Sequence, residues 1–177
     1  MHNGNLAAGS PALILLCGLP GAGKTTFAKE LARRLAFEHI ESDAVRLALS
    51  PAPRYSPAES AAVFARVDFA ARKALKSGRH ALIDATNVTN RDRKRFLRLA
   101  HELGARLVAV RLTAPDDVIR ERLKRPREGF SQAGVAVFER MQPRLQPLSV
   151  PAIVIDSRFS FAPAIDLVVR LVDDREL

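Results

Sequence analysis

The sequence of 177 residues contains a single cysteine, Cys17. One cysteine cannot form an internal disulfide or a thiolate metal cluster, which fits a reducing compartment. Long apolar runs are also missing. The first apolar run, residues 12–17, is far too short to span a bilayer. No basic and apolar secretory leader precedes it. We therefore expect a cytoplasmic protein without membrane contact, and no obligate protein partner is evident.

Acidic residues are in the minority, with 19 Asp and Glu against 28 Lys and Arg and a formal net charge of +9. This excess favours binding of polyanions such as nucleic acid or nucleotides, although an arginine-rich soluble surface explains net charge equally well. Apolar residues make up 47% of the chain, enough for one buried core but not for two full domains. We expect a flexible tail at 1–10 and one domain over 11–177.

Short apolar runs alternate with amphipathic segments along the whole chain. Predicted strands cover about 11–17, 37–41, 80–85, 106–112 and 150–155. Predicted helices cover about 24–36, 44–49, 57–77, 91–103, 116–124, 131–144 and 162–172. Because strands alternate with helices, we expect an α/β fold with a five-stranded parallel sheet and helices on both faces.

A glycine-rich loop, Gly18-Leu-Pro-Gly-Ala-Gly-Lys-Thr25, joins the first predicted strand to the first helix. Its glycines let successive backbone N–H groups curl around phosphates, so this motif in this context predicts a P-loop that binds ATP. Lys24 is expected to neutralise the β- and γ-phosphates, and the Thr25 hydroxyl to ligate Mg²⁺. The nucleotide-binding residues predicted here are Gly18, Pro20, Gly21, Ala22, Gly23, Lys24, Thr25 and Thr26. A chance glycine loop is disfavoured, since strand, loop and helix coincide.

Two further strands are predicted to end in carboxylates on the same rim as the glycine loop. Asp43 follows the second strand and could accept the proton of an incoming hydroxyl, with Arg46 one helical turn later on the same face. Asp43 could instead cap the helix that contains Arg46. Asp84, after three apolar residues of the third strand, is expected to hold magnesium-bound water, or else to cap a turn.

Arginines are abundant beyond the fourth strand, where Arg122, Arg125 and Arg127 lie on a helix end and the following loop. Closure of this loop could bring guanidinium groups onto the phosphates, although arginines in such a run are usually solvated. A second basic cluster consists of Arg91, Arg93, Lys94, Arg95 and Arg98. It could track a polynucleotide backbone, but it has little aromatic interleaving, so a solvated helix face is the preferred interpretation.

Three blocks resemble the P-loop kinase family that includes the 5′-hydroxyl polynucleotide kinases, in particular the kinase module of bacterial end-healing enzymes. The blocks are 18–26, Ser42-Asp-Ala-Val-Arg46, and Ile83-Asp-Ala-Thr-Asn-Val88. The resemblance implies the P-loop NTPase fold with an arginine-bearing lid, Asp43 as general base and Arg46 as its partner. It also implies that a lid arginine among Arg122, Arg125 and Arg127 contacts ATP. Leu123 departs from the Asn that many family members have after the lid arginine.

The leading hypothesis is transfer of the ATP γ-phosphate to a hydroxyl, with the 5′-hydroxyl of a nucleic-acid end as the expected acceptor and Mg²⁺ as cofactor. Catalysis would rest on Lys24, Asp43, Arg46, Arg122 and Arg125, with Arg127 on the nucleotide and Thr25 and Asp84 on the metal. The alternative is a small-molecule kinase acting on a sugar, nucleoside or metabolite, since one fold serves many acceptors. A nucleotide-dependent binding module is a third possibility, although no Asn-Lys-x-Asp guanine signature is present.

Overall fold

The computed structural model describes residues 10–125, 130 and 133–173. Within them lies one five-stranded sheet with the order β2-β3-β1-β4-β5, and every paired strand is parallel. The strands are β1 (Ala12–Cys17), β2 (Glu38–Glu41), β3 (Ala81–Asp84), β4 (Arg106–Thr113) and β5 (Ala152–Asp156). The predicted parallel sheet of the P-loop NTPase fold is thereby confirmed.

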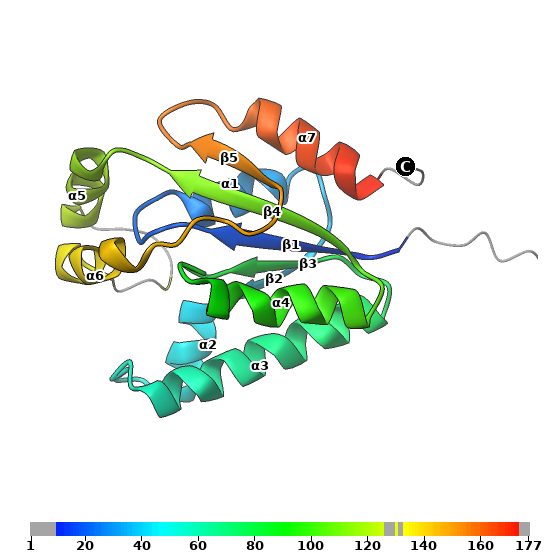
Figure 1. The fold of residues 1–177 in the computed structure, drawn as a ribbon, viewed down its shortest axis with the longest axis horizontal. Helices are drawn as coiled ribbons and strands as arrows, with labels where there is room; N and C mark the ends of the chain where they lie inside the picture. Colours follow the sequence, from blue (N-terminus) through cyan, green and yellow to red (C-terminus); the bar gives the residue numbers. More distant parts are fainter. Residues whose placement is uncertain (1–9, 126–129, 131–132, 174–177) are drawn as a thin grey trace, which may run out of the picture.

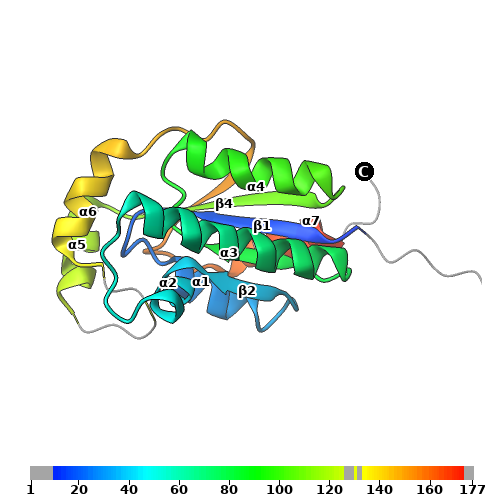
Figure 2. The ribbon, with the colours of Figure 1, turned by 90° about the horizontal axis from the view of Figure 1, so that it is seen from below.

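Helices cover both faces of the sheet (Figure 1). Their bounds are α1 (Lys24–Leu31), α2 (Ser42–Leu49), α3 (Pro57–Lys76), α4 (Asn90–Glu102), α5 (Asp116–Lys124), α6 (Val135–Met141), the 3₁₀ turn η1 (Gln142–Arg144) and α7 (Ala162–Asp173). Helices α1 and α7 lie on one face, and α3 and α4 lie on the other, which Figure 2 shows from below. The alternation predicted from the sequence produces the expected three layers.

Strand β1, in the middle of the sheet, contributes side chains to both of the large apolar cores. Ile14 and Leu16 join the cluster beneath α1 and α7, whereas Leu15 and Cys17 join the cluster against α3 and α4. This alternation follows from the two-residue period of a strand buried on both faces. Burial raises the pKa of the Cys17 thiol to about 11, although Arg93 and Lys24 lower it in part. The thiol therefore stays protonated at neutral pH and serves as a core residue.

Several boundaries differ from the prediction. Helix α1 ends at Leu31 instead of continuing to residue 36, because Arg33 and Arg34 close i→i+3 backbone bonds that tighten the chain into turns. Strand β5 begins only after Pro151, which has no N–H for the ladder. Helix α6 begins at Val135, and the predicted start at 131 lies outside the described residues, as do residues 1–9 of the predicted tail.

A third apolar cluster lies at the carboxyl ends of the strands and joins α5 and α6 to the loops of the sheet. Its buried residues are Leu19, Val88, Ile119, Leu123 and Phe138. Leu123, where the resemblance led us to look for Asn, packs in this cluster and approaches the added Cβ position of Gly21 at 3.1 Å. The cluster therefore fixes α5 and α6 beside the glycine loop. Across the described ranges, no helix is long and apolar enough to cross a membrane.

Arg93 corrects the interpretation of the basic helix as a fully solvated face. Its side chain is 1% exposed and donates hydrogen bonds to the carbonyl oxygens of Asn87, Val88, Gln146 and Pro147. These bonds connect α4 to the loop after β3 and to the segment after η1. Helix α4 begins at Asn90, one residue before the predicted start, and its N-cap residue Thr89 forms a capping box with Asp92.

We expect Arg93→Ala to destabilise the fold by about 3–5 kcal/mol, because several buried carbonyls lose their donor together. Chemical denaturation followed by circular dichroism measures this change. Arg91→Ala is the matched control, since Arg91 is exposed and lies two positions earlier in the same helix. Equal stability of the two variants would contradict this role of Arg93.

Candidate active site

The glycine loop between β1 and α1 has a backbone conformation that requires glycine at some positions. Gly18 has a φ of 151°, and a Cβ added there would lie 2.6 Å from the carbonyl oxygen of Leu112. Gly23 has a φ of 98° immediately before α1. The amide of Gly18 also donates to the carbonyl of Thr86, which links the loop to the end of β3. The loop is thus shaped by glycine positions and tied to the neighbouring strand.

Lys24 begins α1 and turns its ammonium group back toward the loop. Its Nζ lies 3.0 Å from the carbonyl oxygen of Gly18 and 3.1 Å from that of Leu19. The positive end of the α1 dipole points into the same space, together with the backbone amides of the first helical turn. A fixed cation and a helix amino terminus at one point are well suited to bind phosphate.

Thr25 and Asp84 form the candidate magnesium site. The Thr25 hydroxyl donates to Oδ2 of Asp84 at 2.9 Å, and Asp84 is 6% exposed at the end of β3. Hydroxyl and carboxylate oxygens are the hard donors that Mg²⁺ prefers, and Mg²⁺ retains water on its other positions. The two side chains therefore fit a magnesium ion beside Lys24, with Thr25 as a ligand and Asp84 as a ligand or a holder of bound water.

His39 adds a contact that the sequence did not suggest. Its Nε2 lies 3.4 Å from Asp84 Oδ2 and 3.6 Å from Glu41 Oε1, so three potential metal-ligating groups meet at the rim. Burial raises the pKa of Asp84, but the His39 hydrogen bond, the Lys24 charge and the Thr25 hydroxyl outweigh it and leave the pKa below its ordinary value. Asp84 is therefore an anion at neutral pH, as a magnesium site requires. Burial and the charge of Asp84 raise the pKa of Glu41.

Asp43 lies in the first turn of α2 and lines the same cleft as the glycine loop. Helix α2 begins at Ser42, and its N-cap residue Glu41 makes no capping hydrogen bond through its side chain. Nothing among the described contacts therefore gives Asp43 the capping role that was the alternative interpretation. Asp43 is half-buried and lines the cleft, where an acceptor hydroxyl could reach its carboxylate.

Arg46 is buried and already paired, unlike an arginine that is available to bind a phosphate. Its Nη1 lies 2.6 Å from Glu59 Oε1, and its guanidinium stacks 4.5 Å above the centre of the Tyr55 ring. Glu59 also accepts the backbone amide of Arg54. Arg46 lines the cleft as expected, but its charge is compensated, so it holds the α2–α3 loop in the present conformation.

The predicted lid arginines have different surroundings. Arg122 donates to the Ser157 hydroxyl at 2.7 Å, to the Ser157 carbonyl and to the carbonyl of Gly21. It therefore braces the glycine loop against the end of β5. Arg125 is exposed, lines the cleft, and makes no hydrogen bond or ion pair with the described residues. Arg127 lies outside them, so its predicted contact with the nucleotide stays a prediction.

We expect Arg125→Ala to lower kcat about 10- to 100-fold with an unchanged melting temperature, because a guanidinium that reaches the transferring phosphate acts mainly in the transition state. Steady-state kinetics together with thermal denaturation measures both quantities. Lys124→Ala removes the adjacent cation, which pairs with Glu121 on the surface, and serves as the control. If the two variants kept the same kcat, Arg125 would not be the lid arginine.

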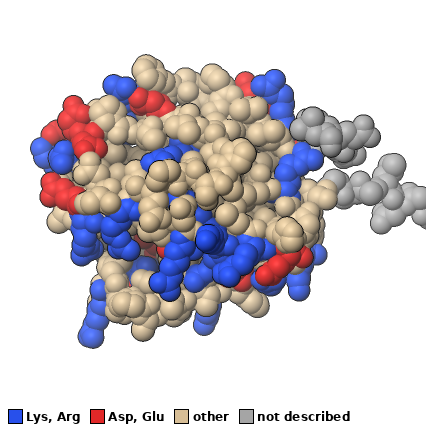
Figure 3. Space-filling model, viewed as in Figure 1, with Lys and Arg blue, Asp and Glu red and all other residues tan. Residues whose placement is uncertain are grey.

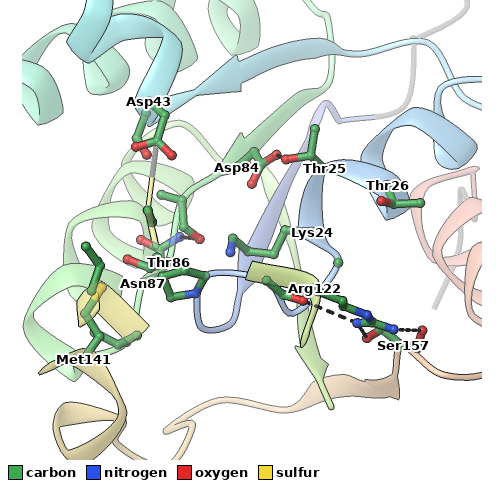
Figure 4. Close-up of a pocket in the computed structure, with 18 of the residues that line it drawn as sticks. Lys24, Thr25, Thr26, Asp43, Asp84, Thr86, Asn87, Arg122, Met141 and Ser157 are labelled. Atoms are coloured by element: carbon green, nitrogen blue, oxygen red, sulfur yellow. Dashed lines mark hydrogen bonds between the residues drawn. The ribbon is translucent and has the colours of Figure 1, made fainter. Parts of the chain in front are cut away.

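One cleft of about 1070 Å³ is lined by Lys24, Thr25, Asp43, Arg46, Asp84, Arg122 and Arg125. Figure 4 shows Asp43, Thr86, Asn87 and Met141 on one side of Lys24, and Thr26, Arg122 and Ser157 on the other. Asp84 and Thr25 lie between the two sides. The cleft therefore has a half beside the first turn of α1 and β5, and an opposite half beside α2 and α6, with the phosphate-binding groups between them.

A family model described as an AAA domain (AAA_33) matches residues 13–148. The chain belongs to this family. One curated relative is the L-seryl-tRNA(Sec) kinase of Methanococcus maripaludis, 26% identical over 115 residues, which are 62% of this chain and 44% of that kinase. The chain thus spans less than half the length of that relative.

Solved structures with the same fold include several kinases. A putative kinase from Chloroflexus aurantiacus matches with a TM-score of 0.75 at 21% identity, over 95% of this chain and 99% of that one. The Mycobacterium tuberculosis APS kinase CysC, in complex with AMPPNP and APS, matches with a TM-score of 0.72 at 18% identity. The match covers 93% of this chain and 99% of that one. A chain of the Pnkp1/Rnl/Hen1 RNA repair complex matches with a TM-score of 0.67 at 24% identity. The match covers 80% of this chain and 46% of that one. At these identities the likeness is one of fold.

The sequence interpretation missed three parts of the site. His39 is two positions before Glu41 on β2, so both side chains lie on one side of the strand, and this alternation was the available signal. Ser157 follows β5 directly, at the strand end where ligands bind in such sheets. The cleft-lining residues Arg140, Met141 and Arg144 lie on α6 and η1, and no local sequence pattern places those elements at the cleft.

Proposed function

We propose that this protein is an ATP-dependent kinase that transfers the γ-phosphate to a hydroxyl of a small molecule, with Asp43 as general base. The observation that carries the proposal is the cleft itself, in which Asp43 faces the groups of the glycine loop across Lys24 (Figure 4). A carboxylate within reach of a phosphate site is what hydroxyl activation requires. ATP would occupy the half of the cleft that contains Thr26, Arg122 and Ser157. The acceptor would occupy the half that contains Asp43.

In the proposed reaction Asp43 takes the proton of the acceptor hydroxyl as its oxygen forms a bond to the γ-phosphorus. The bond between that phosphorus and the β–γ bridging oxygen breaks, and its electron pair leaves with ADP. Lys24 stabilises the charge that develops on the phosphate oxygens. Thr25 and Asp84 would hold Mg²⁺, which would neutralise phosphate charge. Arg125 approaches from α5, while Arg122 keeps the loop in place.

The small-molecule acceptor is preferred to a polynucleotide because the APS kinase aligns over 93% of this chain, whereas the RNA repair chain aligns over 80%. A second candidate remains the 5′-hydroxyl of a nucleic-acid end. It is supported by the basic side chains that gather over α4 in Figure 3, where Arg91, Lys94 and Arg98 are exposed. The name of the tRNA kinase relative also points to an acceptor attached to RNA.

Transfer from γ-labelled ATP to a panel of sugars, nucleosides, APS and 5′-hydroxyl DNA and RNA oligonucleotides tests the proposal. We expect label on a small molecule, with weak dependence on salt. Label on oligonucleotides that falls steeply with added salt would instead establish the second candidate, because several phosphate contacts release counterions. ATP binding without any labelled product would contradict both and support a binding module.

A further inference from the structure

The acceptor half of the cleft has a wall of basic side chains that the proposed reaction does not use. Arg140 and Arg144, on α6 and η1, are four positions apart and both line the cleft. Met141, between them in sequence, lies on the side of Asp43 in Figure 4. Arg54, in the loop between α2 and α3, lines the cleft beside Tyr55. These three arginines are called the acceptor-side arginines below.

The segment that carries Arg140 and Arg144 is held in place by packing, so its backbone keeps a defined position. Phe138, two residues before Arg140, is 0% exposed in the cluster that also contains Leu19 and Val88. The segment after η1 is fixed by two bonds, from the amide of Gln146 to the carbonyl of Val88 and from Arg93 to the carbonyl of Pro147. A rigid backbone therefore presents Arg140 and Arg144 to the cleft.

The charges of the acceptor-side arginines are not compensated within the described part of the chain. All three are exposed, and their guanidinium groups make no hydrogen bond or ion pair with the described residues. Arg46 differs, since Glu59 neutralises it at 2.6 Å. Glu59 accepts the backbone amide of Arg54, but its carboxylate is paired with Arg46. Asp43 and Asp92 are carboxylates of the cleft lining, and Asp92 is engaged by the Thr89 capping box.

A concave surface with excess positive charge concentrates anions, and paired guanidinium groups match the oxygens of a phosphate. A neutral polyol would gain less from three such groups, because it brings no negative charge to pair with theirs. We infer that the acceptor carries a phosphate group, held by Arg140 and Arg144 with Arg54 nearby, while its reacting hydroxyl faces Asp43. This inference rests on the proposed kinase function and narrows its acceptor to phosphorylated hydroxyl compounds.

Matched acceptor pairs test the inference: ribose with ribose 5-phosphate, glycerol with glycerol 1-phosphate, and adenosine with adenosine 3′-monophosphate. A 5′-hydroxyl oligonucleotide forms a further arm, which tells a phosphodiester from a small phosphate monoester. We expect kcat/KM at least about 10-fold higher for the phosphorylated member of the accepted pair, since charge-assisted hydrogen bonds are the strong ones.

The double variant Arg140→Ala/Arg144→Ala should lower kcat/KM about 10- to 100-fold for the phosphorylated acceptor, through a higher KM. It should leave kcat/KM for the neutral partner and KM for ATP unchanged. Arg140→Lys/Arg144→Lys should retain an intermediate value, because lysine keeps the charge but not the paired geometry. Arg98→Ala, an exposed arginine on α4 outside the cleft lining, is the control, and melting temperatures verify folding.

The possible outcomes distinguish failure of this inference from failure of the proposed kinase function. Equal transfer to neutral and phosphorylated members, unaffected by the double variant, would overturn the phosphate-bearing acceptor and leave the kinase intact. A loss that is equal for both members of a pair would also overturn it. No transfer to any acceptor, with ATP still bound, would overturn the kinase and the inference with it.

Discussion

Lys24→Ala is expected to lower kcat by about 10²–10³-fold, because it removes a preorganised cation from the developing phosphate charge. In the structure the ammonium group already lies at the mouth of the glycine loop, 3.0 Å and 3.1 Å from two loop carbonyls. The KM for ATP should rise much less, since the backbone amides of the loop and the α1 amino terminus continue to hold the phosphates. Initial rates of ADP formation at saturating acceptor measure the change.

The control for this variant is Lys76→Ala, at the exposed carboxyl end of α3. It removes the same charge from the same chain but lies outside the lining of the cleft. We expect wild-type kinetics from it. If both variants lost activity equally, net charge would explain the effect, and the assignment of Lys24 to the transition state would fail.

Asp43→Asn is expected to lower kcat by about 10²–10⁴-fold, the range that a positioned general base contributes. The amide is nearly isosteric with the carboxylate but cannot take the proton of the acceptor hydroxyl. Because Asp43 lies on the acceptor side of Lys24, binding of ATP should be unaffected (Figure 4). Isothermal titration with AMPPNP together with steady-state kinetics separates the two effects.

Asp166→Asn makes a suitable comparison, since Asp166 is an exposed residue of α7 that pairs with Arg34 on the far side of the sheet from α2. Its kcat should match that of the wild type. Full activity of Asp43→Asn would mean that another group, or solvent, takes the proton. The base would then have to be sought among the other carboxylates of the cleft, of which Asp92 and Glu30 line it.

The parts of the site that the sequence predicted are those in which the chemistry is local. The glycine loop, Lys24 and Thr25 occupy eight consecutive positions between a strand and a helix, so their relative placement follows from backbone geometry alone. Asp84 was located as well, because a parallel sheet brings the carboxyl ends of β1 and β3 together.

The parts that the sequence did not predict depend on partners far along the chain. Arg93 stands in the run Arg-Asp-Arg-Lys-Arg and looks like solvated surface, yet it bonds to the carbonyl of Pro147, 54 positions away. Its spacing of three from Phe96 placed it on the buried face of α4, and that was the signal overlooked. Arg46 similarly finds Glu59 through the fold of the α2–α3 loop, which no periodicity encodes.

The measurement that tests the central claim most directly is acceptor-dependent formation of ADP and labelled product from γ-labelled ATP and Mg²⁺, with the wild type beside Lys24→Ala. We expect one labelled acceptor molecule for each ADP released by the wild type, and almost none from the variant. ATP that binds tightly to the wild type but yields neither ADP nor a labelled acceptor across the panel would contradict the assignment as a phosphotransferase.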